Sequence, residues 1–255
     1  MDIKFSRSVL VVFLAACYSF YANAAERDVP DIERLAAQPY HGFELILQID
    51  KSLQGTSLHA QRIRVYRYRP DTGEIGFIAR WYVSTGVEAA RENRIGRVTP
   101  RTTLTGYYPV EVLRAVAYSN SWDGMMLYSM FYDVPGGYAI HATEPNKYGR
   151  LGRRASGGCT RLEQKQARYL YRAVAEMGKG WTLKLDRETG EPVLDGSGRP
   201  MPQWTHKALV LIEDGSILEA TRLGFVDRNE VYKSLESLAH YTGQSTPSGV
   251  GVAAR

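Results

Sequence analysis

The chain has 255 residues, of which 44% are hydrophobic and 11% aromatic, a composition typical of a folded protein rather than a disordered one. Its formal net charge is +5, but no dense block of Lys and Arg with interleaved aromatic residues occurs, which argues against nucleic acid as a partner. The length allows one large domain or two small ones, and we expect one.

The first 24 residues have the pattern of a secretory signal peptide. Two basic residues precede an apolar stretch, residues 9–16, that is too short to span a bilayer, and Ala22-Asn23-Ala24 offers a small-x-small cleavage site. A second interpretation stays open, because Leu-Ala-Ala-Cys ending at Cys17 resembles a bacterial lipoprotein box. Membrane anchoring is expected only if Cys17 is lipidated. We favour cleavage after Ala24, and either route predicts a mature protein in the periplasm or cell envelope.

The rest of the chain alternates apolar and polar residues in short runs, which predicts a protein made mainly of strands. Residues 25–42 are expected to form a leader with one or two helical turns. Residues 86–97 are polar and predict a loop, and residues 186–203 are rich in Gly and Pro and predict an insertion or long hairpin loop. The predicted strands are residues 43–49, 62–68, 75–84, 104–117, 125–132, 138–141, 181–185 and 207–213.

The period changes after residue 159, where apolar residues from Ala167 to Met177 recur at helical spacing and Gly178 ends the pattern. Thr160 and Glu163 have the spacing of a capping box, which would start this helix directly after Cys159. A start near Glu163 is the alternative. A helical extension is expected at residues 214–242, followed by a disordered Ser/Gly/Ala-rich tail at residues 243–255. Many short strands with helices at the edge predict a mainly β, sandwich-like domain over residues 43–213.

Cys159 is the candidate nucleophile, because with Cys17 removed or lipidated it is a lone thiol in an exported protein. His141 follows an apolar pair at the predicted end of a strand and is the candidate base that takes the thiol proton. Gly157 and Gly158 directly precede the cysteine and permit the close backbone approach that an oxyanion-binding turn needs. A buried, inert cysteine is the alternative, and its polar and glycine neighbours make that the weaker interpretation.

His141, Ser156, Gly158, Cys159 and Arg161, at this spacing, resemble the signature of the L,D-transpeptidase catalytic domain (the YkuD-like fold). Two positions depart from that signature. Gly157 stands where the family usually has a second histidine, and Ala142 stands where Gly or Ser is usual.

The resemblance extends upstream of the motif. Residues 83–86 (Val-Ser-Thr-Gly) and 98–102 (Val-Thr-Pro-Arg-Thr) are similar to the family's "STG … TPTG" segment. The resemblance covers residues 43–213 and implies the same mainly β fold.

The resemblance implies a cysteine acyltransferase that acts on the stem peptides of peptidoglycan, both as donor and as acceptor. In that reaction His141 deprotonates Cys159, the Gly157–Cys159 turn binds the oxyanion, and a thioester is passed to an amine to give a 3→3 cross-link. Ser156 is expected to donate a hydrogen bond to the cysteine loop or to line the site, and Arg161 is expected to hold that loop or a substrate carboxylate. No cofactor is expected, and no metal, because the chain lacks the spacing of a zinc site.

Two alternatives remain at this point. Water instead of an amine would make the protein a carboxypeptidase or endopeptidase of the same fold, and nothing in the sequence separates these outcomes. A non-catalytic wall-binding protein, in which Gly157 marks decay of the site, is the second.

Overall fold

The computed structural model describes residues 30–51, 61–93 and 95–214. The chain separates into two units, Met1–Asp31 and Ile32–Arg255, and the helices and strands of the described residues all belong to the second unit. The predicted signal peptide, the helical extension beyond residue 214 and the tail lie outside the described residues.

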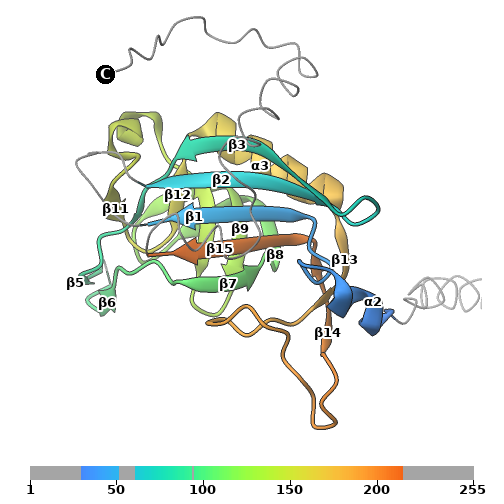
Figure 1. Cartoon of the computed structure of the whole chain (residues 1–255). Helices are drawn as coiled ribbons and strands as arrows, with labels where there is room; N and C mark the ends of the chain where they lie inside the picture. Colours follow the sequence, from blue (N-terminus) through green and yellow to red (C-terminus); the bar gives the residue numbers. More distant parts are fainter. Residues whose placement is uncertain (1–29, 52–60, 94, 215–255) are drawn as a thin grey trace, which may run out of the picture. The chain divides into compact units, whose positions relative to one another are not determined.

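A five-stranded sheet forms the front layer in Figure 1, in the order β3-β2-β1-β15-β7. Its central pair, β1 and β15, is parallel, with Leu45 opposite Ala208, and the other neighbours are antiparallel. All six residues of β1 are buried, as expected for a strand that is covered on both faces. The bounds are β1 Leu45–Asp50, β2 Arg62–Arg69, β3 Glu74–Tyr82, β7 Gly106–Pro109 and β15 Ala208–Glu213.

A four-stranded sheet lies behind it, in the order β12-β10-β9-β8. β8 and β9 form a hairpin, β9 and β10 are antiparallel, and β10 and β12 run parallel. The bounds are β8 Val112–Ser119, β9 Gly124–Asp133, β10 Tyr138–Ala142 and β12 Thr160–Leu162. β10 and β12, which are separated in the chain by residues 143–159, are therefore neighbours in one sheet.

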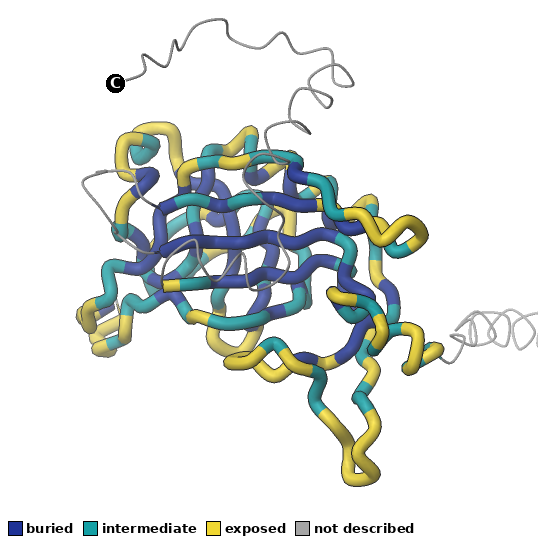
Figure 2. Tube along the Cα trace, viewed as in Figure 1, coloured by how far each residue is buried: buried dark blue, intermediate teal, exposed yellow. Residues whose placement is uncertain are grey.

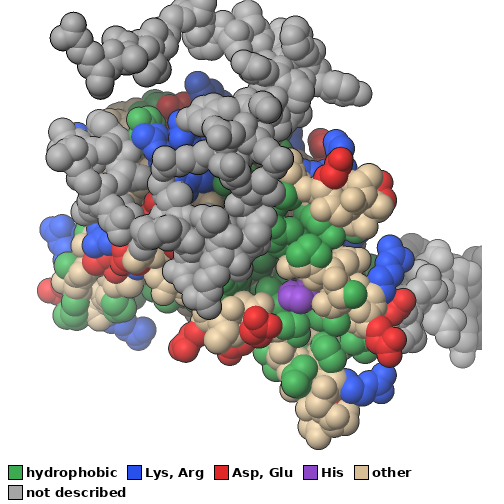
Figure 3. Space-filling view, viewed as in Figure 1, with side chains coloured by type: hydrophobic (Ala, Val, Ile, Leu, Met, Phe, Trp, Pro, Cys, Tyr) green, Lys and Arg blue, Asp and Glu red, His purple; other side chains and the backbone are tan. Residues whose placement is uncertain are grey.

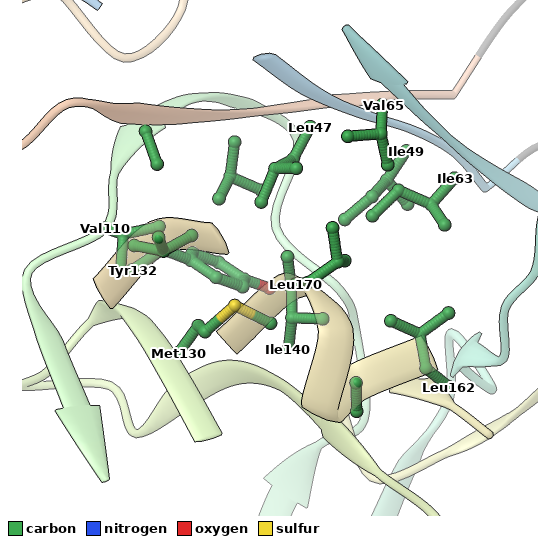
Figure 4. Packing of buried hydrophobic residues seen from close by; sticks show 14 of the residues in the cluster. Leu47, Ile49, Ile63, Val65, Val110, Met130, Tyr132, Ile140, Leu162 and Leu170 are labelled. Carbon is green, nitrogen blue, oxygen red and sulfur yellow. The ribbon is translucent and has the colours of Figure 1, made fainter. Parts of the chain in front are cut away.

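The main core fills the space between these sheets and helix α3 (Gln164–Met177) (Figure 4). β1 contributes every second residue, and Met130, Tyr132, Ile140 and Leu162 come from the four-stranded sheet. α3 contributes Ala167, Leu170 and Val174, which are spaced three and four residues apart and so share one face. Figure 2 shows this burial running along β1 and β15, with exposed residues at the hairpin ends.

A second apolar cluster covers the opposite face of the five-stranded sheet. Phe43 and Leu183 are fully buried there, and the short helix α2 (Ile32–Ala37) packs against the cluster. This helix agrees with the one or two turns predicted near residues 31–37.

The remaining elements are short. They are β4 Thr85–Gly86, β5 Ala90–Glu92, β6 Val98–Pro100, η1 Pro145–Arg150, β11 Arg154–Ser156, β13 Lys179–Leu183 and β14 Pro202–His206. β4 pairs with β11, β13 with β14, and β5 with β6. The β5–β6 hairpin is solvent-exposed and carries charged side chains of both signs (Figure 3).

One strand prediction and one loop prediction were wrong. Residues 104–117 do not form one strand, because the chain leaves the five-stranded sheet after β7 and enters the four-stranded sheet at β8. Val110 is fully buried at this crossing, so its apolar character made two strands look continuous. Residues 86–97 are not a simple loop, since β5 pairs with β6 in a hairpin whose polar residues face solvent on both sides.

The helix after the cysteine begins at Gln164, with Glu163 as its N-cap, and no side-chain cap bond is present. Thr160 lies in β12, so the capping-box prediction was wrong and the later start is correct. The predicted insertion runs into β14, a strand that the Gly and Pro residues before it concealed.

Mainly β architecture with few helices confirms the predicted fold class. Within the described ranges, no helix is long and apolar enough to cross a membrane.

Candidate active site

Cys159 lies in the turn between β11 and β12, the outer strand of the four-stranded sheet. The turn consists of Gly157, Gly158 and Cys159. Gly158 has φ = +131°, a conformation that L-residues with a side chain rarely adopt. A glycine is therefore required at the residue immediately before the cysteine.

The thiol of Cys159 is partly buried and unpaired. Its Sγ donates a hydrogen bond to the carbonyl oxygen of Gly137, at 3.5 Å. Burial raises the pKa of the thiol, and the backbone hydrogen bond from Ala139 and the charge of Arg161 only partly oppose this. The resting thiol is therefore protonated at neutral pH and needs a base to become a nucleophile.

His141 lies in β10 and is 6% exposed. Its Nδ1 is 2.7 Å from the carbonyl oxygen of Ala142, which can only accept, so Nδ1 carries the proton and Nε2 is left as the basic nitrogen. Burial, followed by the charge of Arg161, lowers the pKa of His141 to about 4. The imidazole is thus neutral at physiological pH, the form in which it can accept a proton.

The register of β10 and β12 brings His141 and Arg161 to one face of the sheet. His141 is paired with Arg161, and Ile140 with Thr160, in parallel strands. Ile140 and Leu162 are core residues, and side chains alternate along a strand, so His141 and Arg161 point to the opposite face. Cys159 lies in the turn two residues before Arg161, and the charge of Arg161 acts on both the Cys159 thiol and the His141 ring, so Arg161 is a neighbour of both groups.

Arg161 is partly buried in this arrangement and makes a weak hydrogen bond from Nη1 to the carbonyl oxygen of Ala155, at 3.4 Å. Its backbone forms two hydrogen bonds with Ser84, which fixes its position along the strand. Burial lowers the pKa of its guanidinium, the neighbouring Arg101 adds to this, and Glu144 opposes it. Among the described residues, no carboxylate lies within 4 Å of this guanidinium.

Ser156 is fully buried and does not line the site, which differs from one of its expected roles. Its hydroxyl donates to the carbonyl oxygen of Cys159 at 2.6 Å and accepts from the N–H of Gly158 at 3.0 Å. Ser156 therefore braces the turn from inside. It also occupies one of the N–H groups expected to serve in oxyanion binding.

Thr103 is a second brace, and the sequence did not single it out. Its hydroxyl donates to the carbonyl oxygen of Gly158 at 2.5 Å and accepts from the N–H of Gly86 at 2.7 Å. The resemblance of residues 98–102 to the family's upstream segment pointed to this neighbourhood but stopped one residue short.

The ion pair of Lys51 and Glu88 holds Thr103 in place. Lys51 is 4% exposed, and its Nζ donates to the carbonyl oxygen of Thr103 at 2.7 Å and contacts Glu88 at 3.2 Å. Glu88 accepts the N–H of Thr103 at 3.2 Å. Both backbone polar groups of Thr103 are thus engaged by charged partners, which strengthens the hydrogen bonds that position the cysteine turn.

Aromatic rings close on the two glycines. A Cβ added at Gly157 would lie 2.6 Å from Nε1 of Trp122, and one at Gly158 would lie 3.0 Å from the ring of Tyr138. Trp122 was predicted only as part of the turn between two strands. Contacts between residues so distant in sequence leave no local signal.

No group of three or more His, Cys, Asp and Glu side chains with the geometry of a metal site occurs in residues 30–51, 61–93 and 95–214. The chemistry available at Cys159 is that of a thiol, an imidazole and backbone N–H groups. This combination suits acyl transfer through a thioester.

Residues 51–194 match the sequence profile of the L,D-transpeptidase catalytic domain (YkuD). A search of curated proteins gave no significant match.

Among solved structures, the chain is similar to an L,D-transpeptidase (residues 123–326) from Xylanimonas cellulosilytica, at 19% identity and a TM-score of 0.41 over 67% of this chain and 61% of that one. An L,D-transpeptidase from Mycobacterium smegmatis is 14% identical, with a TM-score of 0.41 over 67% and 59% of the two chains. L,D-transpeptidase 3 from Mycobacterium tuberculosis is 13% identical, with a TM-score of 0.39 over 68% and 62%. The match spans about three fifths of each of these structures.

The profile match covers more than half of the chain, including the β10–β12 region and the cysteine turn. The chain belongs to the YkuD family of L,D-transpeptidase catalytic domains.

Proposed function

We propose that this protein is a cysteine acyltransferase that acts on peptidoglycan stem peptides, with Cys159 as nucleophile and His141 as general base. The observation that supports the proposal is the register of β10 and β12, which pairs His141 with Arg161, the residue whose charge also acts on Cys159. Family membership supplies the reaction class and the substrate class.

The first half-reaction starts from two neutral groups. As Sγ of Cys159 attacks the carbonyl carbon of the third stem residue, Nε2 of His141 takes the thiol proton. The hydrogen bond from Nδ1 to the carbonyl oxygen of Ala142 holds the ring in this tautomer and remains in place when the ring is charged. Arg161 stabilises the developing thiolate, since its charge lowers the pKa of Cys159.

The tetrahedral intermediate carries a negative charge on the former carbonyl oxygen. Because Ser156 occupies the N–H of Gly158, the N–H groups of Gly157 and Cys159 remain to bind this oxyanion. Collapse breaks the bond to the terminal residue, whose amine leaves with the proton from His141. The product is a thioester between the third stem residue and Cys159.

In the second half-reaction an amine of an acceptor stem attacks the thioester. His141 takes the amine proton and returns it to Sγ as the thiol leaves, which restores the resting state and gives the 3→3 cross-link. Water in place of the amine would give a carboxypeptidase or endopeptidase by the same two steps.

We propose further that the protein works in the periplasm or cell envelope, after export through the signal peptide of residues 1–24. The mass of the mature protein tests this. Cleavage after Ala24 leaves an unmodified chain that begins at Ala25, whereas lipidation leaves a chain that begins at Cys17 and carries added acyl mass.

The experiment that tests the function is incubation of the purified protein with tetrapeptide-bearing wall fragments, followed by mass spectrometry of protein and products. We expect a covalent acyl adduct on Cys159 and cross-linked products, both lost in Cys159→Ala and His141→Gln. His206→Gln is the matched control, since His206 is also buried but lies in β14, outside the candidate site.

Faropenem is a second probe of the same thiol, because L,D-transpeptidase 3 from Mycobacterium tuberculosis has been solved with a faropenem-derived adduct. Hydrolysed fragments without cross-links would identify the hydrolytic alternative. Absence of any adduct with both probes would contradict an enzymatic role and favour a wall-binding protein.

A further inference from the structure

Trp122, in the turn of the β8–β9 hairpin, lies directly against the cysteine turn. A Cβ built on Gly157 would be 2.6 Å from Nε1, 2.7 Å from Cε2 and 3.0 Å from Cδ1 of the indole ring. Separations below 3.0 Å do not occur between real Cβ atoms and their neighbours. The ring therefore occupies the space that any side chain at position 157 would need.

This packing explains why position 157 is glycine. Unlike Gly158, Gly157 does not have a positive φ, so its backbone conformation is open to residues with side chains. The glycine is required by the volume of Trp122 and not by the path of the chain. The indole thus fills the space beside the backbone of Gly157 that a side chain of the loop would otherwise occupy.

The side chain of Arg101 lies against the same indole ring. Its guanidinium carbon is 5.0 Å from the centroid of the Trp122 ring, which is the geometry of a cation–π contact. Its Nε is buried and has no hydrogen-bond partner among the described residues. No described carboxylate lies within salt-bridge distance of the group, whereas Arg91 and Arg161 are charged neighbours of the same sign.

Arg161 is a charged neighbour of the Cys159 thiol, and Arg101 is a charged neighbour of Arg161. Neither guanidinium forms a salt bridge with a carboxylate of the described residues, although the charge of Glu144 acts on Arg161. A planar guanidinium with free N–H groups is suited to bind a carboxylate in a bidentate manner. The ring of Trp122 restricts where the Arg101 group can move.

We propose that Arg101, held on the ring of Trp122, binds a carboxylate of the substrate peptide beside Cys159 and acts with Arg161 as the acid-specific subsite. The proposal deepens the proposed function and rests on it for the identity of the peptide. It predicts that this protein selects acidic peptides over their amidated forms. It also assigns to Trp122 and Gly157 the task of positioning Arg101.

The test uses binding rather than turnover, so that it does not depend on catalysis. Full-length Cys159→Ala protein is titrated by calorimetry with stem tetrapeptides in which one carboxyl group at a time is replaced by its amide. We expect amidation of one carboxyl group to weaken binding about ten- to a hundredfold, the range for a charge-assisted hydrogen bond. In Cys159→Ala/Arg101→Gln that difference should fall to about twofold or less.

Arg91→Gln in the same background is the matched control. Arg91 is an exposed arginine of β5 that carries the same charge near Arg101 but has no contact with Trp122. It should keep most of the preference for the acid. Trp122→Ala should lose much of it and Trp122→Phe should retain it, since phenylalanine keeps an aromatic face. Circular dichroism checks that each variant is folded.

Equal binding of all amidated peptides, an equal effect of Arg91→Gln and Arg101→Gln, or no binding of any peptide would each overturn the subsite. The function is judged separately, by the acyl adduct of the wild-type protein. Acid preference without an adduct would leave the subsite standing and refute the acyltransferase, and an adduct without acid preference would do the reverse.

Discussion

The hydroxyl of Thr103 connects the cysteine turn to β4, and its removal by Thr103→Val has an effect that can be worked out from the structure. Thr103 is fully buried and bonds the carbonyl oxygen of Gly158 and the N–H of Gly86 through one oxygen atom. Valine has nearly the same shape but cannot bond either group. Two buried backbone groups are then left without partners.

Each buried polar group left without a partner costs about 1–3 kcal/mol, so Thr103→Val should lower the free energy of unfolding by about 2–6 kcal/mol. Thr103→Ser keeps the hydroxyl and removes one methyl group, which should cost about 1 kcal/mol. The turn that carries Cys159 also loses a constraint, and we expect acylation by a stem-peptide donor or faropenem to slow about tenfold or more.

The free energy of unfolding is measured by denaturant titration of the wild-type protein, both Thr103 variants and Thr105→Val. The effect on the position of Cys159 is measured as the rate of adduct formation by the same proteins. Thr105 is the control because it is exposed and only two residues away. If Thr103→Val were as stable as Thr105→Val to within about 0.5 kcal/mol, the argument from unsatisfied groups would be refuted. Normal acylation by Thr103→Val would refute the positioning role.

Three further predictions concern pH and packing. His141 has a folded pKa of about 4, so it stays neutral in the folded protein while the unfolded chain takes up a proton near pH 6.5. The contribution of this histidine to stability is therefore present above pH 6.5 and is lost as pH falls to 4. In unfolding measurements over this range the wild type should lose about 3 kcal/mol more than His141→Gln, and an equal loss would contradict the lowered pKa. Because burial raises the pKa of Cys159, alkylation by iodoacetamide should continue to accelerate as pH rises past 9, and a rate independent of pH below 8 would instead indicate a thiolate–imidazolium pair. Gly157→Ala should lower the free energy of unfolding by about 1–3 kcal/mol through overpacking against Trp122, but by under about 1 kcal/mol in a Trp122→Ala background. A double-mutant cycle with no coupling would show that the Trp122 ring does not exclude a side chain at position 157.

Features with a local signal can be predicted from the amino-acid sequence alone. The apolar run of β1 and the helical spacing of α3 predicted a buried strand and an amphipathic helix, because each depends on the period of side chains along one element. The motif around Cys159 and His141 likewise predicted the family, since its residues are close in the chain. Their catalytic roles remain predictions.

The contacts that position those residues depend on the tertiary structure. One apolar run, residues 104–117, was divided between two sheets, because burial of Val110 at the crossing gives the same pattern as burial within a strand. The contact of Thr103 with Gly158 joins residues 55 apart, and Trp122 reaches Gly157 from another hairpin. Such contacts depend on which strands become neighbours, and no short stretch of sequence contains that information.

The protonation states at the site were decided in the same way. In an unfolded, solvated chain a cysteine and a histidine have ordinary pKa values. Packing against the sheet buries both groups, which raises the pKa of Cys159 and lowers that of His141. The residue types came from the sequence, but their charges follow from desolvation, which exists only once the chain has folded.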